Sequence, residues 1–190
     1  MFAQKKNYFL IIESIKDFDL KNIKNGNKFS IIYRNQKNPE KKNELLKFRK
    51  ECRLKFIKFF IANDIKLALF LNADGIYVSS FNRSLKFLNY KKSNFQIIGS
   101  AHNIKEISLK CQQGCSSILF SKLFLVSYDK NAQYLGINRF NNFLKLNKNL
   151  IPLGGINLMN LNSLRNVRST GFALLSEIKK KPAKIINRLF

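Results

Sequence analysis

The chain has 190 residues, 45% hydrophobic and 13% aromatic, which is enough to bury one full core, so a single domain over residues 1–190 is the simplest organisation. Its 35 Lys and Arg residues against 11 Asp and Glu give a formal charge of +24, which favours anionic partners. The lysines are scattered along the whole chain, as is typical of a solvated helical exterior, and no apolar stretch approaches the roughly 18 residues of a membrane-spanning helix. No membrane partner is therefore expected.

The first segment, MFAQKKNYFLIIES, places two lysines before an apolar run. This run is too short for a secretory signal and lacks a small-residue cleavage site, so it is predicted to be the first strand. Cys52, Cys111 and Cys115 are odd in number and have neither disulfide nor metal-site spacing. They are expected to be small core residues of a protein in the reducing cytoplasm.

Short β-rich runs alternate with longer, lysine-studded segments of helical period along the chain. The short runs are continuously apolar, as expected for strands of a parallel sheet that is covered on both faces. Strands are predicted at residues 8–12, 28–33, 56–61, 75–78, 95–99, 117–120, 150–153 and 171–175.

The clearest predicted helix covers residues 39–54, where Leu45, Phe48 and Cys52 recur at intervals of three and four residues. Pro39 is suited to its first turn. Further helices are expected at residues 103–113, 139–147, 158–167 and 177–189, with a shortened one around residues 17–24. About eight strand and helix units indicate an α/β fold, a compact (β/α)8 TIM barrel.

Such a barrel collects its chemistry just past the carboxyl ends of its strands. Polar residues follow most of the predicted strands, namely Arg34, Asn35, Gln36, Lys37, Asn63, Asp64, Ser79, Ser80, Asn82, Ser100, His102, Ser121, Lys122, Ser127, Asp129, Lys130 and Ser176. After the seventh strand, Gly154 and Gly155 let the backbone approach an anion, and the residues after Leu175 can open a helix whose N–H groups face that anion. This end of the barrel is therefore predicted to bind a phosphorylated or diphosphorylated ligand.

The ordered motifs YRNQK, AND before LALFLNADGIYV, IIGSAH, IPLGGI and GFALLSEI resemble those of the thiamine phosphate synthase / TenI family. The resemblance runs from about the second strand to near the end of the chain. LAL with ADG and IIGSAH are fairly specific, whereas GGI is common to many barrels. The resemblance implies an Mg2+-dependent transferase that joins hydroxymethylpyrimidine diphosphate to a thiazole phosphate and releases pyrophosphate through a pyrimidine carbocation.

The resemblance also implies a role for individual residues. Diphosphate binding would fall to Arg34, Gln36, Lys37, Asn63, Ser100 and Lys130. The thiazole phosphate would be held by Gly154, Gly155, Leu175 and Ser176. Gln36 stands where the family usually has a lysine, and Lys130 aligns only with a one-residue gap. Cations and a metal would take up the charge that develops on the departing diphosphate.

The metal-binding positions depart from the family pattern. Asp64 matches the first metal-binding aspartate only if one residue is deleted before Leu67, and Asn82 stands in place of the second. An amide is a weaker Mg2+ ligand than a carboxylate. The alternative function is therefore a catalytically weakened barrel that binds thiazole phosphate or thiamine phosphate without turnover. A third possibility, a basic nucleic-acid-binding protein, lacks any recognised motif, so no specific nucleic acid is expected as a partner.

Several predicted site residues also have a purely structural explanation. Arg34 could be an ordinary cation at a strand end, Asp64 could cap a helix, Ser100 could cap the helix after it, and the paired glycines could relieve packing. His102 is expected to be a satisfied loop side chain rather than a base. The tautomerase branch of the family uses a histidine after the sixth strand, where this chain has Lys122, and this difference argues against tautomerase activity.

Overall fold

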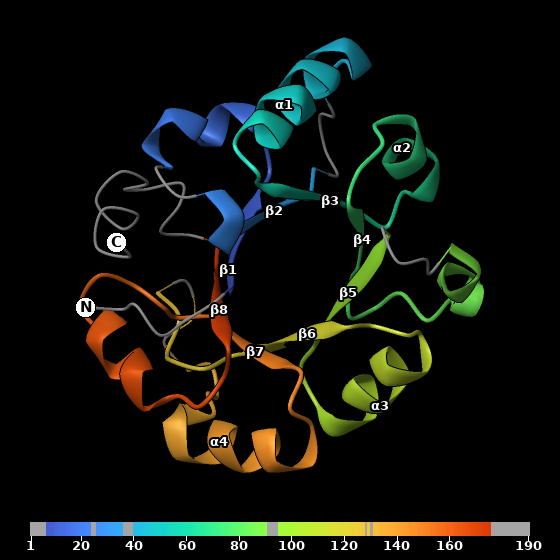
Figure 1. Ribbon diagram of the computed structural model, residues 1–190. Coiled ribbons are helices and arrows are strands. Elements are labelled where there is room, and N and C mark those ends of the chain that lie inside the picture. The colour runs from blue at the N-terminus through green and yellow to red at the C-terminus, as the bar shows by residue number, and fades with distance from the viewer. Residues whose placement is uncertain are drawn as a thin grey trace.

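The computed structural model describes residues 7–23, 26–35, 40–90, 95–127, 129 and 131–175. Eight parallel strands pair in chain order, and β1 pairs with β8, so the sheet closes into a barrel with the helices outside it (Figure 1). The strands are β1 (Asn7–Ile12), β2 (Phe29–Tyr33), β3 (Lys58–Ala62), β4 (Gly75–Val78), β5 (Gln96–Ala101), β6 (Ser117–Ser121), β7 (Leu150–Leu153) and β8 (Gly171–Leu174). The predicted (β/α)8 TIM barrel is confirmed, whereas a single domain over residues 1–190 stays a prediction.

The third strand begins two residues later than predicted, at Lys58 instead of residue 56. Phe56 has a φ of 57°, and the N–H of Ile57 donates to the Cys52 carbonyl at 2.9 Å. These residues therefore close the preceding helix, and the apolar side chains that suggested a strand belong to a turn.

In the part of the chain that the structure describes, four α-helices lie outside the barrel: α1 (Lys42–Leu54), α2 (Ile65–Phe70), α3 (Ile104–Gln112) and α4 (Gly136–Leu146). The described connections also contain the 3-10 helices η1 (Ile15–Asp17), η2 (Leu20–Asn22), η3 (Gly26–Lys28), η4 (Leu85–Tyr90) and η5 (Leu161–Asn166). None of these helices is long and apolar enough to cross a membrane. The predicted helix at residues 177–189 and Pro39 lie outside the described residues.

Two predicted helices are wrong in type. The segment predicted as a helix around residues 17–24 holds the end of η1 and all of η2, because the Ser14 side chain caps η1 and the Asp19 carboxylate accepts the N–H of Lys21. Such side chains compete with the helical hydrogen bonds of the backbone. Residues 158–167 contain η5 in place of an α-helix, and Asn157 and Asn160 hydrogen-bond locally before it.

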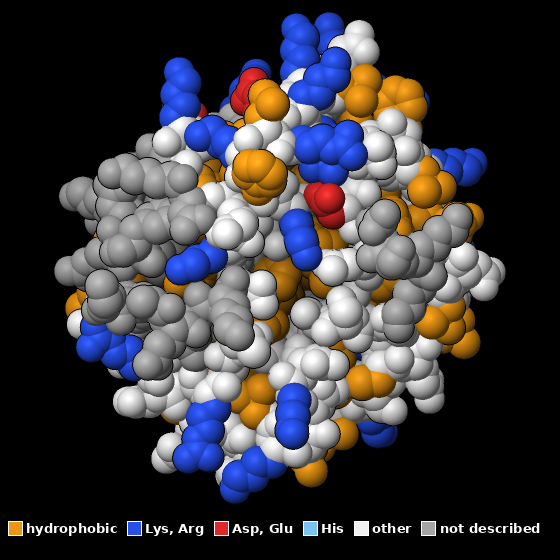
Figure 2. Space-filling model, viewed as in Figure 1, with side chains coloured by type: hydrophobic (Ala, Val, Ile, Leu, Met, Phe, Trp, Pro, Cys, Tyr) orange, Lys and Arg blue, Asp and Glu red, His pale blue; other side chains and the backbone are white. Residues whose placement is uncertain are grey.

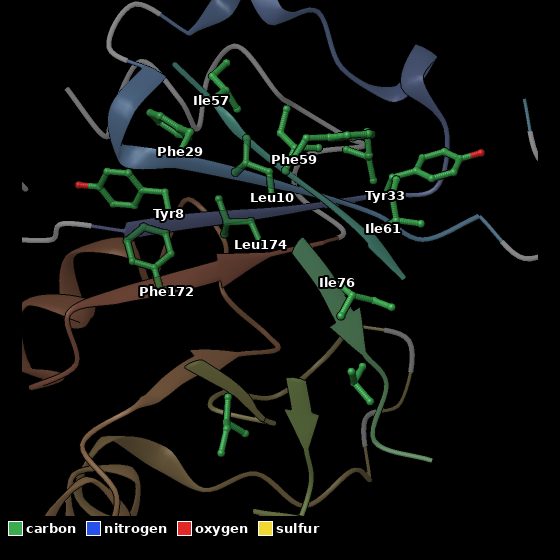
Figure 3. Packing of buried hydrophobic residues seen from close by; sticks show 14 of the residues in the cluster. Tyr8, Leu10, Phe29, Tyr33, Ile57, Phe59, Ile61, Ile76, Phe172 and Leu174 are labelled. Carbon is green, nitrogen blue, oxygen red and sulfur yellow. The ribbon is translucent and has the colours of Figure 1, made fainter. Parts of the chain in front are cut away.

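The core has two layers that follow the alternation of side chains along each strand. The barrel interior is filled by Phe9, Ile11, Ile32, Phe60, Tyr77, Ile98, Leu119, Ile151 and Ala173. The residues between them pack outward against the helices, and Figure 3 shows Tyr8 between Phe29 and Phe172, with ring centroids 5.1 Å apart in both pairs. The carboxyl end of the barrel is called the mouth below. On each strand, the residue two positions after an inner-layer residue points to the same side, so past the strand end it faces the mouth.

Glu40 ties the end of β2 to the segment after β1. Its Oε1 accepts hydrogen bonds from Ser14 Oγ at 2.6 Å and the N–H of Ile15 at 2.9 Å, and its Oε2 accepts from the Tyr33 hydroxyl and from Asn35 Nδ2 at 3.2 Å. Burial raises the pKa of this carboxyl, but the hydrogen bonds outweigh burial and lower the pKa to about 2.

We expect Glu40→Gln to destabilise the protein at neutral pH by about 1–3 kcal/mol, since hydrogen bonds to a charged group are lost. The folded pKa of about 2 is below the ordinary value of 4.5, so the carboxylate stabilises the fold above pH 4.5. This contribution is lost as pH falls from about 4.5 toward 2. Urea unfolding at pH 7 and pH 3 should show the difference between the two proteins shrinking, and an equal difference at both pH values would contradict the role of the charge.

Candidate active site

A cavity of about 360 Å³ opens at the mouth, within the size range of small-molecule sites. The carboxyl ends of β1, β2, β5, β6, β7 and β8 supply its lining, which is Glu13, Arg34, His102, Ser121, Lys122, Val126, Leu153, Gly154, Gly155, Ile156, Ala173, Leu174 and Leu175. Arg34, Gly154, Gly155 and Leu175 were predicted from different parts of the chain, and the structure brings them to one cavity.

Arg34 directly follows β2, and its N–H donates to the Ile12 carbonyl of β1 at 2.8 Å. Its Nη2 lies 3.7 Å from Glu13 Oε1, and the two side chains are 30% and 47% exposed. An ion pair that is this exposed to solvent is weak. The guanidinium of Arg34 is therefore able to bind an anion in the cavity.

Tyr77 and Ser100 lie beside Arg34 at the top of the barrel interior. Burial raises the pKa of the Tyr77 hydroxyl, while a hydrogen bond to Ser100 and the charge of Arg34 act to lower it. Ser100 was predicted to bind the diphosphate, but it is 5% exposed and is not among the residues that line the cavity. Its alternative role as a helix cap is wrong, because Asn103 caps α3 through the N–H of Glu106.

The paired glycines after β7 are required by the backbone. Gly154 and Gly155 have φ values of +93° and +70°, a region that L side chains rarely adopt. A Cβ on Gly155 would lie 2.3 Å from the Phe124 carbonyl oxygen and 2.5 Å from that of Leu125. Close packing at Gly155 therefore excludes a Cβ, and it leaves a compact backbone turn at the wall of the cavity.

Ser121 and His102 form a hydrogen-bonded pair that the sequence did not predict. Ser121 Oγ lies 2.8 Å from His102 Nδ1, and Glu106 Oε2 accepts the backbone N–H of His102 at 2.8 Å. His102 thus has a partner, as expected, but it also lines the cavity next to Lys122. Both residues lie at the carboxyl ends of neighbouring strands, β5 and β6. Their positions in the sequence could therefore have predicted that the two side chains are close.

Asn63, Ser79 and Asn82 form a separate network on the β3–β4 side of the mouth. Asn63 Nδ2 donates to Ser79 Oγ at 2.7 Å. Asn63 Oδ1 accepts from the Ser79 N–H at 3.0 Å and from Asn82 Nδ2 at 3.1 Å. Asn63 and Asn82 were predicted as ligand-binding residues, and the structure brings them together but not among the residues that line the cavity of Arg34.

Asp64 caps α2, since its Oδ1 accepts the N–H of Leu67 at 2.9 Å. The structural explanation of Asp64 is therefore correct, and its second oxygen is not used by that cap. Across the described residues, no group of three or more His, Cys, Asp or Glu side chains could hold a metal ion. Gln36, Lys37, Lys130 and Ser176 lie outside the described residues.

A buried lysine on α3 fastens the loop that carries Asn82. Lys110 is 0% exposed, and its Nζ donates to the carbonyls of Ser79 at 2.7 Å and Asn82 at 2.9 Å and to Gln113 Oε1 at 2.9 Å. Gln113 Nε2 donates to the carbonyls of Asn82 and Ser84, both at 2.9 Å. Burial lowers the pKa of Lys110.

We expect Lys110→Met to destabilise the protein by about 1–3 kcal/mol, because the Ser79 carbonyl loses a buried donor while the methionine fills the space. Amide hydrogens of residues 79–84 should exchange faster with solvent. Lys105→Met, which removes an exposed charge from the same helix, is the control. Unchanged exchange in the loop of the Lys110 variant would exclude the fastening role.

Sequence comparison identifies relatives with a common description. A family model described as thiamine monophosphate synthase matches residues 17–178. A thiamine-phosphate synthase of Prochlorococcus marinus strain AS9601 is 30% identical over 178 residues, covering 92% of this chain and 49% of that protein. A thiamine-phosphate synthase of Picrophilus torridus is 29% identical over 170 residues, covering 81% of this chain and 83% of that protein. The chain thus spans about half the length of the first relative.

Solved structures match the fold over almost the whole chain. A thiamine phosphate pyrophosphorylase from Pyrococcus furiosus superposes with a TM-score of 0.73 at 18% identity, covering 100% of both chains. KGPDC from Streptococcus mutans superposes with a TM-score of 0.61 at 12% identity, covering 98% of this chain and 100% of that chain. At such low identity these likenesses support the barrel architecture alone.

Proposed function

This chain belongs to the thiamine monophosphate synthase family, and from that membership we propose that it joins hydroxymethylpyrimidine diphosphate to thiazole phosphate. In this reaction the C–O bond to the diphosphate breaks, pyrophosphate leaves with the electron pair, and the thiazole captures the pyrimidine cation. The observation that carries the proposal is the single cavity that contains both Arg34 and the Gly154–Gly155 turn.

The proposed work of the residues is electrostatic. Arg34 and Lys122 border the cavity and would stabilise negative charge as it develops on the departing pyrophosphate. The Gly154–Gly155 turn and Leu175 would hold the thiazole phosphate on the β7–β8 side, where parallel barrels often bind phosphate. The His102–Ser121 pair lines the same cavity and would donate a proton to the leaving pyrophosphate.

The proposed reaction uses Mg2+, which would bind together with the diphosphate substrate. Proteins usually bind Mg2+ through one or two carboxylates together with substrate phosphates. Asp64 keeps one carboxylate oxygen outside its capping bond, which fits such a site, while Asn82 donates to Asn63 and would be a weak ligand. When bound, the ion would neutralise charge on the diphosphate. Cys52, Cys111 and Cys115 form no disulfide among the described residues, which is consistent with the proposed location in the reducing cytoplasm.

One assay tests the proposed function directly. The protein is incubated with both precursors and Mg2+, and formation of thiamine phosphate and of pyrophosphate is followed over many turnovers. Stoichiometric production of both compounds is expected. Tight binding of thiazole phosphate or thiamine phosphate without pyrophosphate release would instead support the weakened barrel that binds its ligand without turnover.

Two substitutions at Asp64 separate its capping role from its proposed role at the metal. Asparagine caps helices about as well as aspartate, whereas alanine does not, so Asp64→Ala should lose about 1 kcal/mol of stability and Asp64→Asn almost none. If the carboxylate binds Mg2+, both variants should need at least about tenfold more Mg2+ for half-maximal activity. An unchanged Mg2+ requirement in Asp64→Asn would leave Asp64 with the capping role alone.

A further inference from the structure

A second cavity, of about 550 Å³, lies at the opposite end of the barrel from the mouth. Its lining is Arg49, Arg53, Lys58, Asn72, Ala73, Asp74 and Gln96. Lys58 is the first residue of β3, Asp74 precedes β4, and Gln96 is the first residue of β5, so this amino-end cavity lies where the strands begin. Figure 2 shows Lys and Arg side chains gathered around an acidic side chain in the region between α1 and β3.

Arg49 is fixed in place by the fold. Only 6% exposed, it donates from Nε to the Asn72 carbonyl and from Nη2 to Asp74 Oδ1, both at 3.1 Å. Asp74 Oδ2 accepts the N–H of Phe59 at 2.7 Å. Arg49 and Asp74 therefore stabilise the barrel. They also form a rigid, charged part of the wall of the amino-end cavity.

Arg53 and Lys58 are different, because both are exposed and neither forms an ion pair with an acidic side chain of the described residues. Arg53 lies one helical turn after Arg49 on α1, so both side chains are on the same face. Lys58 Nζ donates to the neutral Gln96 Oε1 at 3.3 Å.

The charges in the amino-end cavity do not balance. Three cations, Arg49, Arg53 and Lys58, face one carboxylate, Asp74, which leaves a net charge of +2. Asn72 and Gln96 add neutral amides to the lining. A rigid guanidinium, a second arginine and a lysine are the groups that proteins use to bind phosphate. The volume fits a small molecule, and a nucleic-acid strand would need a longer groove.

We propose that the amino-end cavity is a second anion site, which binds a phosphate dianion carried as free phosphate or as a small phosphate monoester. This second site does not depend on the reaction proposed at the mouth. Arg53 and Lys58 supply the positive charge that the ligand neutralises. Arg49 forms the rigid part of the cavity wall against which the ligand binds.

The test is a titration of the 15N-labelled protein with inorganic phosphate, followed by NMR at low ionic strength. Amide signals of Ala73, Asp74 and Gln96 should shift and saturate. Signals of Gly154 and Gly155 report separately on the mouth, so failure at one end is distinguishable from failure at the other. A parallel titration with glycerol 3-phosphate determines the source, because tighter binding of the ester assigns a phosphate-monoester site.

Arg53→Ala/Lys58→Ala should weaken phosphate binding in the amino-end cavity by about tenfold or more, since charge-assisted contacts are lost. The matched control is Lys47→Ala/Lys50→Ala, which removes the same charge from the exposed surface of α1 outside the cavity. Absence of shifts at the amino end, or equal weakening by both double variants, would overturn the site in favour of diffuse attraction by a basic protein. A response of these amides to an oligonucleotide but not to phosphate would also overturn it.

Discussion

Arg34→Ala is expected to lower kcat/KM for the proposed formation of thiamine phosphate by about a hundredfold or more, the usual loss when a preorganised donor to a developing anion is removed. Arg34 is the cation placed by β2 in the cavity of the mouth, and its ion pair with Glu13 is long at 3.7 Å. The diphosphate should therefore displace Glu13 as the partner of the guanidinium. Steady-state kinetics with each substrate varied in turn would measure the effect, which should be larger for the diphosphate.

Glu13→Gln is the matched control for Arg34. It keeps the shape of the side chain and removes the carboxylate that competes with the diphosphate, so the KM for the diphosphate should stay the same or fall. A loss of activity as large as that of Arg34→Ala would show instead that the Glu13–Arg34 pair acts by maintaining the mouth. Equal unfolding free energies of the variants and the parent protein are needed to exclude loss of the fold.

The barrel itself could be predicted because each of its strands is a continuous apolar run. A strand that contacts the barrel interior on one face and helices on the other has no polar side, and Phe59 and Phe60 of β3 illustrate this with 0% and 1% exposure. The position of Arg34 just past a predicted strand then placed it at the mouth, and the family resemblance added Leu175. Both residues line the observed cavity.

Features that depend on contacts between distant residues could not be predicted in this way. Lys110 has the sequence context of any solvent-facing lysine on a helix, yet it is fully buried and binds carbonyls 31 and 28 residues earlier in the chain. The start of α4 was placed at residue 139, three residues late. Leu135 at its N-cap makes no side-chain capping bond, and Gly136 has a φ of 70°. The sequence therefore lacks the capping residue that usually marks the start of a helix.

The site was predicted more completely on one side of the mouth than on the other. Strand ends and glycines gave the β7–β8 side, whose residues Gly154, Gly155 and Leu175 line the cavity. On the β3–β4 side, Asn63 and Asn82 hydrogen-bond to each other, and which atoms pair cannot be read from residue type. Asp64 was equally suited to a cap and to a metal ligand, and the cap is the role that the structure confirms.

Gly155→Ala is expected to cause the largest combined loss of stability and ligand binding. The added Cβ would meet two carbonyl oxygens, of Phe124 and Leu125, at 2.3 Å and 2.5 Å, and backbone atoms cannot move aside as flexible side chains do. Overpacking and left-handed strain together should cost about 2–4 kcal/mol. The segment 124–125 or the glycine turn must then shift, and the proposed binding of thiazole phosphate should fall with it.

Gly136→Ala separates these two causes, because Gly136 has the same φ of +70° and no heavy atom within 4 Å of the added Cβ. It should show the left-handed strain alone, about 1 kcal/mol, with thiazole phosphate binding unchanged. Urea unfolding and calorimetric titration with thiazole phosphate would compare the two variants. If Gly155→Ala bound the ligand as tightly as Gly136→Ala did, the turn after β7 would be a packing device, and the phosphate would have to be held by other groups of the cavity.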